Sequence, residues 1–247
     1  MIDPEKRKNN KEEIPWEHYQ KLYEKLDPEE VSLRCGVDYD EAAGGFLIRL
    51  MGKSYRVSHP DFVVTTEDAG FAALRDTYPA KILVARYLIE GRCTPFGGSY
   101  VTYRDVPGGE LYFRNFQGRC LARLAFGFGS RLEEFSKALE SIGGKRVKTG
   151  DAGYEFEFIN HVNLQFILWS GDDEFPPSSQ ILFSDNVTSA FTAEDMAVIG
   201  DVSIGTLKAM CCLLYTSLPR SAWVFAALCR GWTPRRPTSW IPAALVR

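Results

Sequence analysis

The stretch YEFEFINHVNLQFILW, residues 154–169, decides the fold. Apolar and polar residues alternate on both sides of Asn160-His161, which is the period-two pattern of half-buried strands. Because Asn tolerates the positive φ that tight turns require, we expect the turn at Asn160-His161. The stretch therefore predicts an antiparallel hairpin with strands at 154–158 and 162–169.

A second hairpin is predicted upstream, where FLIRL at 46–50 and SYRV at 54–57 flank a short Met51-Gly52-Lys53 link. After each hairpin comes a short apolar run and then a helical pattern. The first set comprises a strand at 62–64 and a helix from Pro79 to Gly91, and the second a strand at 181–183 and a helix from Thr192. An old duplication and the chance recurrence of a common β-β-β-α piece both explain this likeness.

Apolar residues at helical spacing predict the remaining helices. They lie at 15–26, at 28–35 with Gly36 as C-cap, at 111–128 and at 130–142, where Ser130 and Glu133 match a capping box. The segment 95–109 is rich in Gly, Pro and Thr and predicts a loop with one short strand. We therefore expect an α+β fold with a mixed, mainly antiparallel sheet flanked by helices.

The two ends of the chain differ in composition from the middle. Residues 1–12 are polar and charged and predict a flexible N-terminus, while residues 13–210 predict a single domain. Residues 211–247 carry five arginines but no Asp, Glu or Lys, and three of the five tryptophans. We interpret them as a non-native or disordered tail that continues no helix or strand. A genuine basic tail for a membrane or nucleic acid is the rival interpretation.

Composition excludes several classes of protein. With a net charge of −3 the 247-residue chain has no global basic field, so we expect no nucleic-acid partner. No run approaches about 18 apolar residues and no secretory signal is evident, so we expect no membrane partner and a cytoplasmic location. The six cysteines include no C-x-x-C, which argues for buried or incidental thiols and against a metal site.

The clearest candidate site is the loop WSGDDEFPP, residues 169–177. Its three consecutive carboxylates, Asp172, Asp173 and Glu174, follow Trp169 at a strand end and precede two prolines. Crowded like charges raise a carboxylate pKa unless a cation compensates, so such clusters can hold cations or act as acid and base. A solvated turn is the alternative interpretation.

Three further residues are candidates for binding or chemistry. Arg104 and Asp105 stand in a loop bounded by Gly and Pro, where the arginine fork suits a carboxylate or other anion and an internal salt bridge is the alternative. His59 is a candidate general base or a structural histidine, and His161 is interpreted as a turn residue. No glycine pattern for nucleotide phosphates is present.

Four segments carry a resemblance to a known family: 169–177, QILF at 180–183 with Asp185, YRDVPGG at 103–109, and TAED at 192–195. Over about residues 17–208 the chain resembles the domain-of-unknown-function family 3786 of bacteria and archaea, many of them anaerobes. The resemblance implies no assigned activity. Some relatives are suspected of binding iron-sulfur clusters through an added N-terminal cysteine segment, which is missing here, so no cluster is expected.

These observations lead to a functional hypothesis with two alternatives. We expect a ligand-binding or accessory protein, connected with anaerobic metabolism, in which Asp172, Asp173, Glu174 and Arg104 line a polar pocket. A hydrolytic or transfer enzyme that uses those carboxylates with His59 is the first alternative. A protein-interaction module is the second, because aromatic residues are abundant along 154–169. The cofactor, if any, and the small-molecule or protein partner remain unidentified at this stage.

Overall fold

The structure is a computed structural model that describes residues 13–68 and 70–216. The described residues up to Cys211 form one compact unit built on a nine-stranded, antiparallel sheet. The strand order is β4-β3-β2-β7-β8-β9-β5, with β1 added to β2 and β6 added to β7. The two hairpins predicted at 46–57 and 154–169 are confirmed as β2–β3 and β7–β8. The α+β fold class is therefore confirmed.

The two halves of the chain repeat one order of elements, namely two helical segments, four strands and two helices. The first half consists of α1 Glu13–Tyr23, α2 Pro28–Cys35, β1 Tyr39–Asp40, β2 Gly45–Leu50, β3 Lys53–Ser58, β4 Val64–Thr65, α3 Ala73–Asp76 and α4 Tyr78–Glu90. The second half consists of α5 Gly109–Phe116, α6 Arg123–Phe128, α7 Leu132–Ser141, β6 Lys145–Val147, β7 Ala152–Ile159, β8 Val162–Trp169, β9 Ser178–Ser184, α8 Val187–Ala190 and α9 Ala193–Thr216. A π-helical segment, Gln117–Ala122, joins α5 to α6, and strand β5 Tyr100–Thr102 with a 3-10 turn, Tyr103–Asp105, separates the halves.

The halves meet at the centre of the sheet, where β2 pairs with β7 through Leu50 and Ile159. The Met51 N–H donates to the Phe158 carbonyl at 2.8 Å, and the Asn160 N–H donates to the Arg49 carbonyl at 3.2 Å. Each bond joins the first turn residue of one hairpin to the penultimate strand residue of the other. The two hydrogen bonds are therefore related by a local two-fold axis between the hairpins. Because the hairpins pair through equivalent positions, we favour a duplication over chance recurrence.

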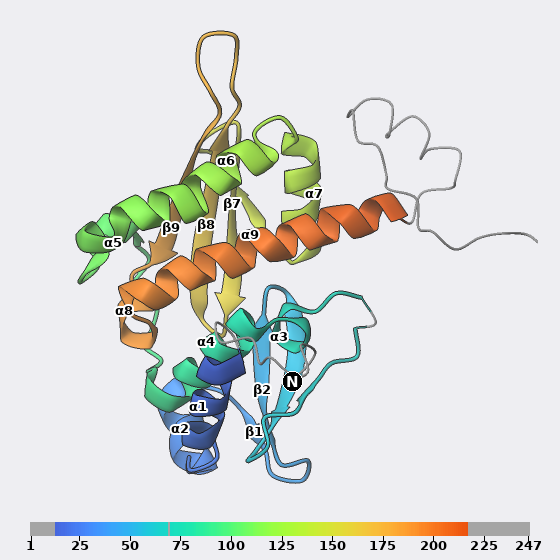
Figure 1. Cartoon of the computed structure of the whole chain (residues 1–247), viewed down its shortest axis with the longest axis vertical. Coiled ribbons are helices and arrows are strands. Elements are labelled where there is room, and N and C mark those ends of the chain that lie inside the picture. Colours follow the sequence, from blue (N-terminus) through green and yellow to red (C-terminus); the bar gives the residue numbers. More distant parts are fainter. Residues whose placement is uncertain (1–12, 69, 217–247) are drawn as a thin grey trace, which may run out of the picture. The chain divides into compact units, whose positions relative to one another are not determined.

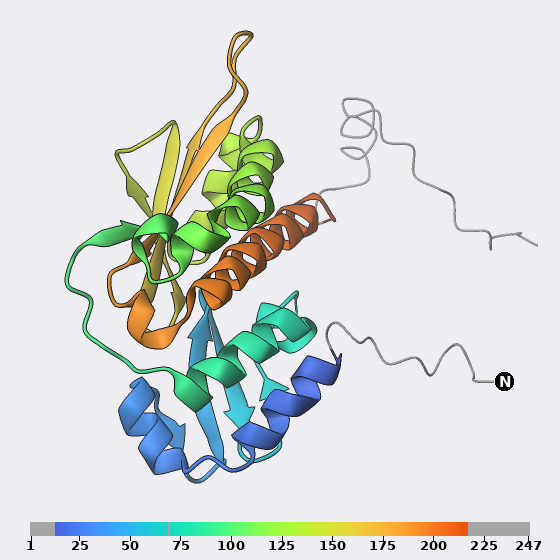
Figure 2. The same ribbon diagram turned by 60° about the vertical axis from the view of Figure 1, so that its left-hand side comes forward.

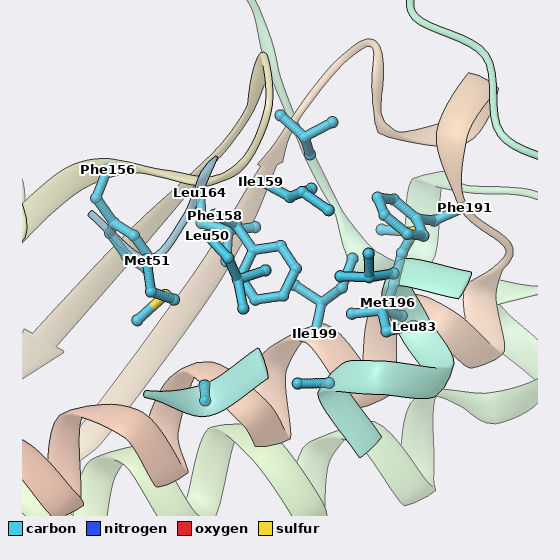
Figure 3. Close-up of a cluster of buried hydrophobic side chains, with 14 of the residues drawn as sticks. Leu50, Met51, Leu83, Phe156, Phe158, Ile159, Leu164, Phe191, Met196 and Ile199 are labelled. Carbon is cyan, nitrogen blue, oxygen red and sulfur yellow. The ribbon is translucent and has the colours of Figure 1, made fainter. Parts of the chain in front are cut away.

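Helices cover one face of the sheet, and the core lies between the two layers (Figures 1 and 2). The apolar residues at alternate strand positions point into this core because successive side chains of a strand face opposite sides. Figure 3 shows side chains from both hairpins, from α4 and from α9 packed in one cluster around Phe158. The shared cluster explains why the two halves form one compact unit. None of the helices in the described part is long and apolar enough to cross a bilayer.

Four local predictions need correction. Ser130 does not cap α7: its N-cap is Arg131, no side chain caps it, and Glu133 pairs with Lys137 instead. The strand predicted at 62–64 begins only at Val64, because Phe62 takes a positive φ of 54°. In the turn at 160–161, His161 has the positive φ of 67°, whereas the Asn160 side chain accepts the Arg49 N–H.

The fourth correction concerns the C-terminal tail. The sequence predicted no helix beyond residue 210, yet α9 continues to Thr216 and Cys211 is buried against the Glu134 carbonyl. A run without Gly or Pro over 211–216 offers nothing that ends a helix. Residues 217–247 and the N-terminal residues 1–12 lie outside the described residues.

Candidate functional site

The structure leaves the predicted acidic loop in solvent. Asp172, Asp173 and Glu174 lie in the β8–β9 connection, and all three are exposed. Asp172 accepts the Glu174 and Phe175 N–H groups at 2.9 and 2.7 Å, and these bonds lower the pKa of its carboxyl group. Trp169 is half-buried at the end of β8. The loop is thus a hydrogen-bonded exposed turn, and neither of the cavities described below includes it.

The other predicted residues lie apart from that loop. Arg104 stacks on the Phe113 ring at 3.8 Å and lies 3.4 Å from Glu110, and all its neighbours are at the start of α5. Asp105 accepts the Thr102 N–H and hydroxyl groups and so closes a capping box. His59 packs edge-on against Tyr23, and its buried Nε2 finds no hydrogen-bond partner among the described residues. The structure therefore does not bring Arg104, His59 and the acidic loop together.

The sheet face that carries no helices holds a different set of polar residues. Along β7 and β8 the half-buried residues alternate with core residues, so that Glu157 and Asn163 point to this open face. The connection from α4 to β5 runs on the same side, away from α6 and α9 (Figure 2). Between this connection, the end of α2 and the β7–β8 turn lies a cavity of about 490 Å³. We call it the open-face cavity; its lining consists of Leu33, Gly36, Cys93, Thr94, Pro95, Phe96, Glu157, His161 and Asn163.

A thiol and an imidazole flank the glycine that ends α2. Gly36 has φ 61°, the left-handed conformation of a helix C-cap, and a Cβ at this position would lie 3.0 Å from Cys93 Sγ and 3.9 Å from His161 Cδ2. Cys93 is held there because its N–H donates to the Arg34 carbonyl at 2.8 Å. Cys93 and His161 therefore both border the space that glycine leaves at position 36.

A charged carboxylate closes one wall of the cavity. Glu157 receives a two-pronged interaction from Arg49, with N–O distances of 2.7 and 3.0 Å, and it accepts the His161 N–H at 2.8 Å. Partial burial opposes ionisation, but the Arg49 guanidinium and the His161 N–H outweigh it and lower the pKa of Glu157. Glu157 is therefore ionised at neutral pH and orients the His161 backbone.

Two buried polar residues fix the walls relative to each other. The Asn186 amide donates to the Thr94 carbonyl at 2.9 Å and to the His161 carbonyl at 3.0 Å, while its oxygen accepts the Ser184 hydroxyl at 2.6 Å. Asn186 is 6% exposed and Ser184 is fully buried. Asp185 binds the same connection through the Gly97 and Ser99 N–H groups. Because Asn186 bridges both walls, it holds Cys93 and Thr94 next to His161.

At the related corner, the β2–β3 turn packs directly on the end of α7. Gly52 is the counterpart of His161, as the second residue of its hairpin turn, and a Cβ on Gly52 would lie 2.7 Å from Ile142 Cα at the end of α7. In the first half, the same kind of contact places His161 against Gly36. The two corners therefore differ in their turn residues: Gly52 contacts Ile142, whereas His161 borders the open-face cavity. Gly143, which follows α7 as Gly36 follows α2, faces open space.

Sequence reasoning missed most of these residues. Cys93 was interpreted as an incidental thiol and His161 as a turn residue, while Glu157, Asn163 and Asn186 drew no attention. One signal was available, since a histidine at the second position of a tight turn occupies a conformation that favours glycine. The other residues come from three distant segments and carry no local pattern.

A second hollow, of about 620 Å³, lies beside the α1–α2 turn and is lined mainly by consecutive residues from Lys25 to Glu29. Its Asp27 is already engaged as the N-cap of α2, with bonds to two backbone N–H groups. Although this hollow is larger, it has no thiol and no imidazole in its lining. Within residues 13–68 and 70–216, no group of three or more His, Cys, Asp or Glu side chains is placed to hold a metal ion. The open-face cavity is the better candidate site.

Comparison with known proteins gives one match. A family model described as "Domain of unknown function (DUF3786)" matches residues 27–206, which include every residue of the open-face cavity. No curated protein and no solved structure matches the chain.

Proposed function

The chain belongs to the DUF3786 family, a family of unknown function, and from this premise we propose that it binds a small molecule in the open-face cavity. The observation that carries the proposal is the hollow beside the β7–β8 turn, which is lined by a thiol, an imidazole and a carboxylate. The equivalent turn residue of the other hairpin, Gly52, instead contacts Ile142. Its volume of about 490 Å³ is in the usual range of small-molecule sites, roughly 300 to 1,000 Å³.

The lining indicates an amphipathic ligand. Leu33 and Phe96 are exposed large apolar residues, at 86% and 37%, and they offer a surface for an apolar body. The inner wall offers hydrogen-bonding groups from Asn163 and His161 for a polar head. We therefore expect a ligand with an apolar part of a few rings or carbons and a neutral polar end, because Glu157 is already neutralised by Arg49.

Disulfide tethering tests binding directly, since Cys93 is half-exposed in the cavity while Cys35 and Cys120 are fully buried. The protein is equilibrated with a panel of fragment disulfides under partly reducing conditions, and capture is located by peptide mass spectrometry. We expect Cys93 to select a few amphipathic fragments and to lose that selectivity in Asn163→Ala. Glu174→Ala in the exposed β8–β9 loop is the matched control and should retain it. Capture of all fragments in proportion to their intrinsic reactivity would refute the proposal.

A second candidate function, thiol-dependent acyl transfer, is favoured by the positions of Cys93 and His161 on either side of Gly36. In this reaction the Cys93 thiol gives its proton to the His161 imidazole, and the thiolate adds to the carbonyl carbon of an acyl donor. The leaving group departs with the proton from the imidazolium, and water then hydrolyses the thioester. Glu157 would act as a positioning residue through its bond to the His161 N–H.

Alkylation of Cys93 by iodoacetamide separates the two candidates. A general base raises the thiolate fraction, so His161→Gln should slow alkylation at pH 7 by about tenfold or more if His161 activates the thiol. An unchanged alkylation rate would refute the acyl-transfer function and would not bear on the proposed ligand binding. Buried thiols provide an internal control, because burial above all raises the pKa of Cys35 to about 11 and that of Cys120 to about 12.

The earlier alternatives receive less support. Glu174 and its neighbours are exposed and lie apart from His59, which gives the carboxylate-based enzyme no shared site. The aromatic residues of 154–169 that suggested an interaction module are mostly core residues, such as Phe156 and Phe166. The proposal retains the cytoplasmic location and the accessory role in anaerobic metabolism that the sequence and the family resemblance predict.

A further inference from the structure

Helices α6 and α9 lie side by side on the helical face of the sheet (Figures 1 and 2). Three cationic residues of this region, Arg123, Arg131 and Lys208, form a group. Lys208 extends from α9 over Gly127 of α6, and a Cβ on Gly127 would lie 2.8 Å from Lys208 Cε and 3.0 Å from Nζ. Glycine at position 127 therefore makes room for the lysine side chain. Arg123 lies one turn before Gly127 in α6, and the Arg131 guanidinium, which follows α6, donates to the Gly127 carbonyl. We call Arg123, Arg131 and Lys208 the Lys208 cluster.

The Lys208 ammonium group has no counter-ion within the described part of the chain, and no hydrogen bond there either. Its side chain is half-buried between the two helices. Partial burial first, and then the charges of Arg123 and Arg131, lower the pKa of Lys208. The Lys208 ammonium group and the Arg131 guanidinium therefore both lie beside Gly127, at a place that is partly shielded from water.

The nearby carboxylates are already engaged by arginines. Asp201 binds both Arg119 and Arg123, with the Arg119 contact at 2.9 Å. Glu134 lies 3.3 Å from Arg131. Among residues 13–68 and 70–216, the four cations around this contact thus share two carboxylates, which leaves an excess of two positive charges.

We propose that the Lys208 cluster binds a phosphoryl group, either inorganic phosphate or the phosphate of a small ester. A dianion matches the excess of two positive charges, and its several oxygens can accept from one ammonium and two guanidinium groups together. A monocarboxylate has half the charge and too few acceptor oxygens. This site is separate from the open-face cavity and does not depend on the function proposed for it.

The test compares the thermal stability of the full chain in potassium phosphate, potassium sulfate and potassium chloride at equal ionic strength. We expect phosphate, and sulfate as its tetrahedral dianionic mimic, to raise the melting temperature of the wild-type protein more than chloride does. Lys208→Gln, which keeps the length and helix propensity of the residue, should weaken phosphate binding at least tenfold. Without phosphate this variant should melt no lower than wild type, because the substitution removes like-charge repulsion. Glycerol 3-phosphate is then compared with inorganic phosphate. Tighter binding of glycerol 3-phosphate would identify the ligand as a phosphate ester, and equal or weaker binding would identify it as free phosphate.

Lys148→Gln is the matched control, since Lys148 is exposed near strand β6 and has no role in the Lys208 cluster. It should respond to phosphate as the wild-type protein does. Equal stabilisation of all three proteins by phosphate, or equal effects of the three salts, would overturn the proposal by showing general screening only. Reductive ¹³C-methylation of lysines adds a local measurement. The NMR signal of Lys208 is assigned as the one that is missing in Lys208→Gln, and we expect it to shift when phosphate is added. An unshifted signal would refute the site.

Discussion

Replacing Asn186 with alanine should destabilise the protein by about 3 kcal/mol and disconnect the walls of the open-face cavity. The substitution removes two donated bonds, to the Thr94 and His161 carbonyls, and the acceptor of the Ser184 hydroxyl. Asn186 is 6% exposed, the Ser184 hydroxyl is buried and the two carbonyl bonds are partly buried, so the abandoned groups are partly shielded from water. Each buried polar group left without a partner costs roughly 1 to 3 kcal/mol, and three groups lose their partner here. Because these groups can partly rearrange or bind water, we expect the total near the lower end of the range summed over the three groups.

Urea denaturation measures the loss of stability, and the rate of Cys93 alkylation measures the loss of order in the cavity. In Asn186→Ala we expect faster alkylation of Cys93, since its segment is no longer tied to His161. Asn163→Ala is the control: this side chain lines the cavity but forms no hydrogen bond within the described residues, so it should cost under about 0.5 kcal/mol. A loss below about 0.5 kcal/mol in Asn186→Ala, with unchanged alkylation, would refute the bridging role of Asn186.

Three further predictions concern the two hairpin turns. Gly52→Ala should destabilise the protein by about 2 to 4 kcal/mol in urea denaturation, because Gly52 has φ 73° and its Cβ would meet Ile142 at 2.7 Å; a neutral result would contradict the packed corner. His161→Gly should be neutral or stabilising by up to about 1 kcal/mol, since glycine relieves the positive φ of 67°, yet it should abolish fragment selection at Cys93. Glu157→Gln should cost about 0.5 to 1 kcal/mol at pH 7 by loss of the fork with Arg49. Because folding lowers the pKa of Glu157, this contribution is present above the unfolded carboxyl pKa of about 4.3 and disappears as pH falls through the folded value, so wild type and Glu157→Gln should converge in acid.

The sequence predicts the fold wherever one local rule decides the conformation. The two hairpins follow from alternation, and α2 follows from Asp27 as N-cap, Pro28 in the first turn and Gly36 as C-cap, all as predicted. Prediction fails where two rules compete. Ser130 and Glu133 match a capping box, but Glu133 is also four residues before Lys137, and the helical ion pair prevails.

The pairing of the two hairpins with each other could not be predicted from local sequence patterns. The β2–β7 junction consists of one registered pair and two flanking bonds, and its partners are separated by half the chain. Periodicity within a strand fixes which side chains face the core, but it does not specify which edge strand a hairpin joins. The repeated order of elements was visible in the sequence, whereas the two-fold exchange of bonds that explains it was not.

The sequence prediction of a site at 172–174 rests on charge density, whereas the candidate site in the structure is a cavity. Three adjacent carboxylates are conspicuous in a sequence, but a loop that projects into solvent lets each of them be hydrated, so nothing has to be compensated there. In the open-face cavity each residue is ordinary by itself. Glu157 is the polar position of an alternating strand, Cys93 follows a helix, and Asn186 follows a strand.

The strongest sign of a site in this chain is a departure from its own internal repeat. Where both halves obey the same packing, as at the central pair of Leu50 and Ile159, the repeat accounts for the residues. At the second turn position one half has glycine, which tolerates the positive φ, and the other has His161, which is strained there. Met51 in the first turn also has a positive φ, of 50°, but its corner is packed, whereas His161 borders a hollow. A histidine in this position, next to a thiol and an ionised carboxylate and held by a buried amide, therefore argues for a ligand at the open-face cavity.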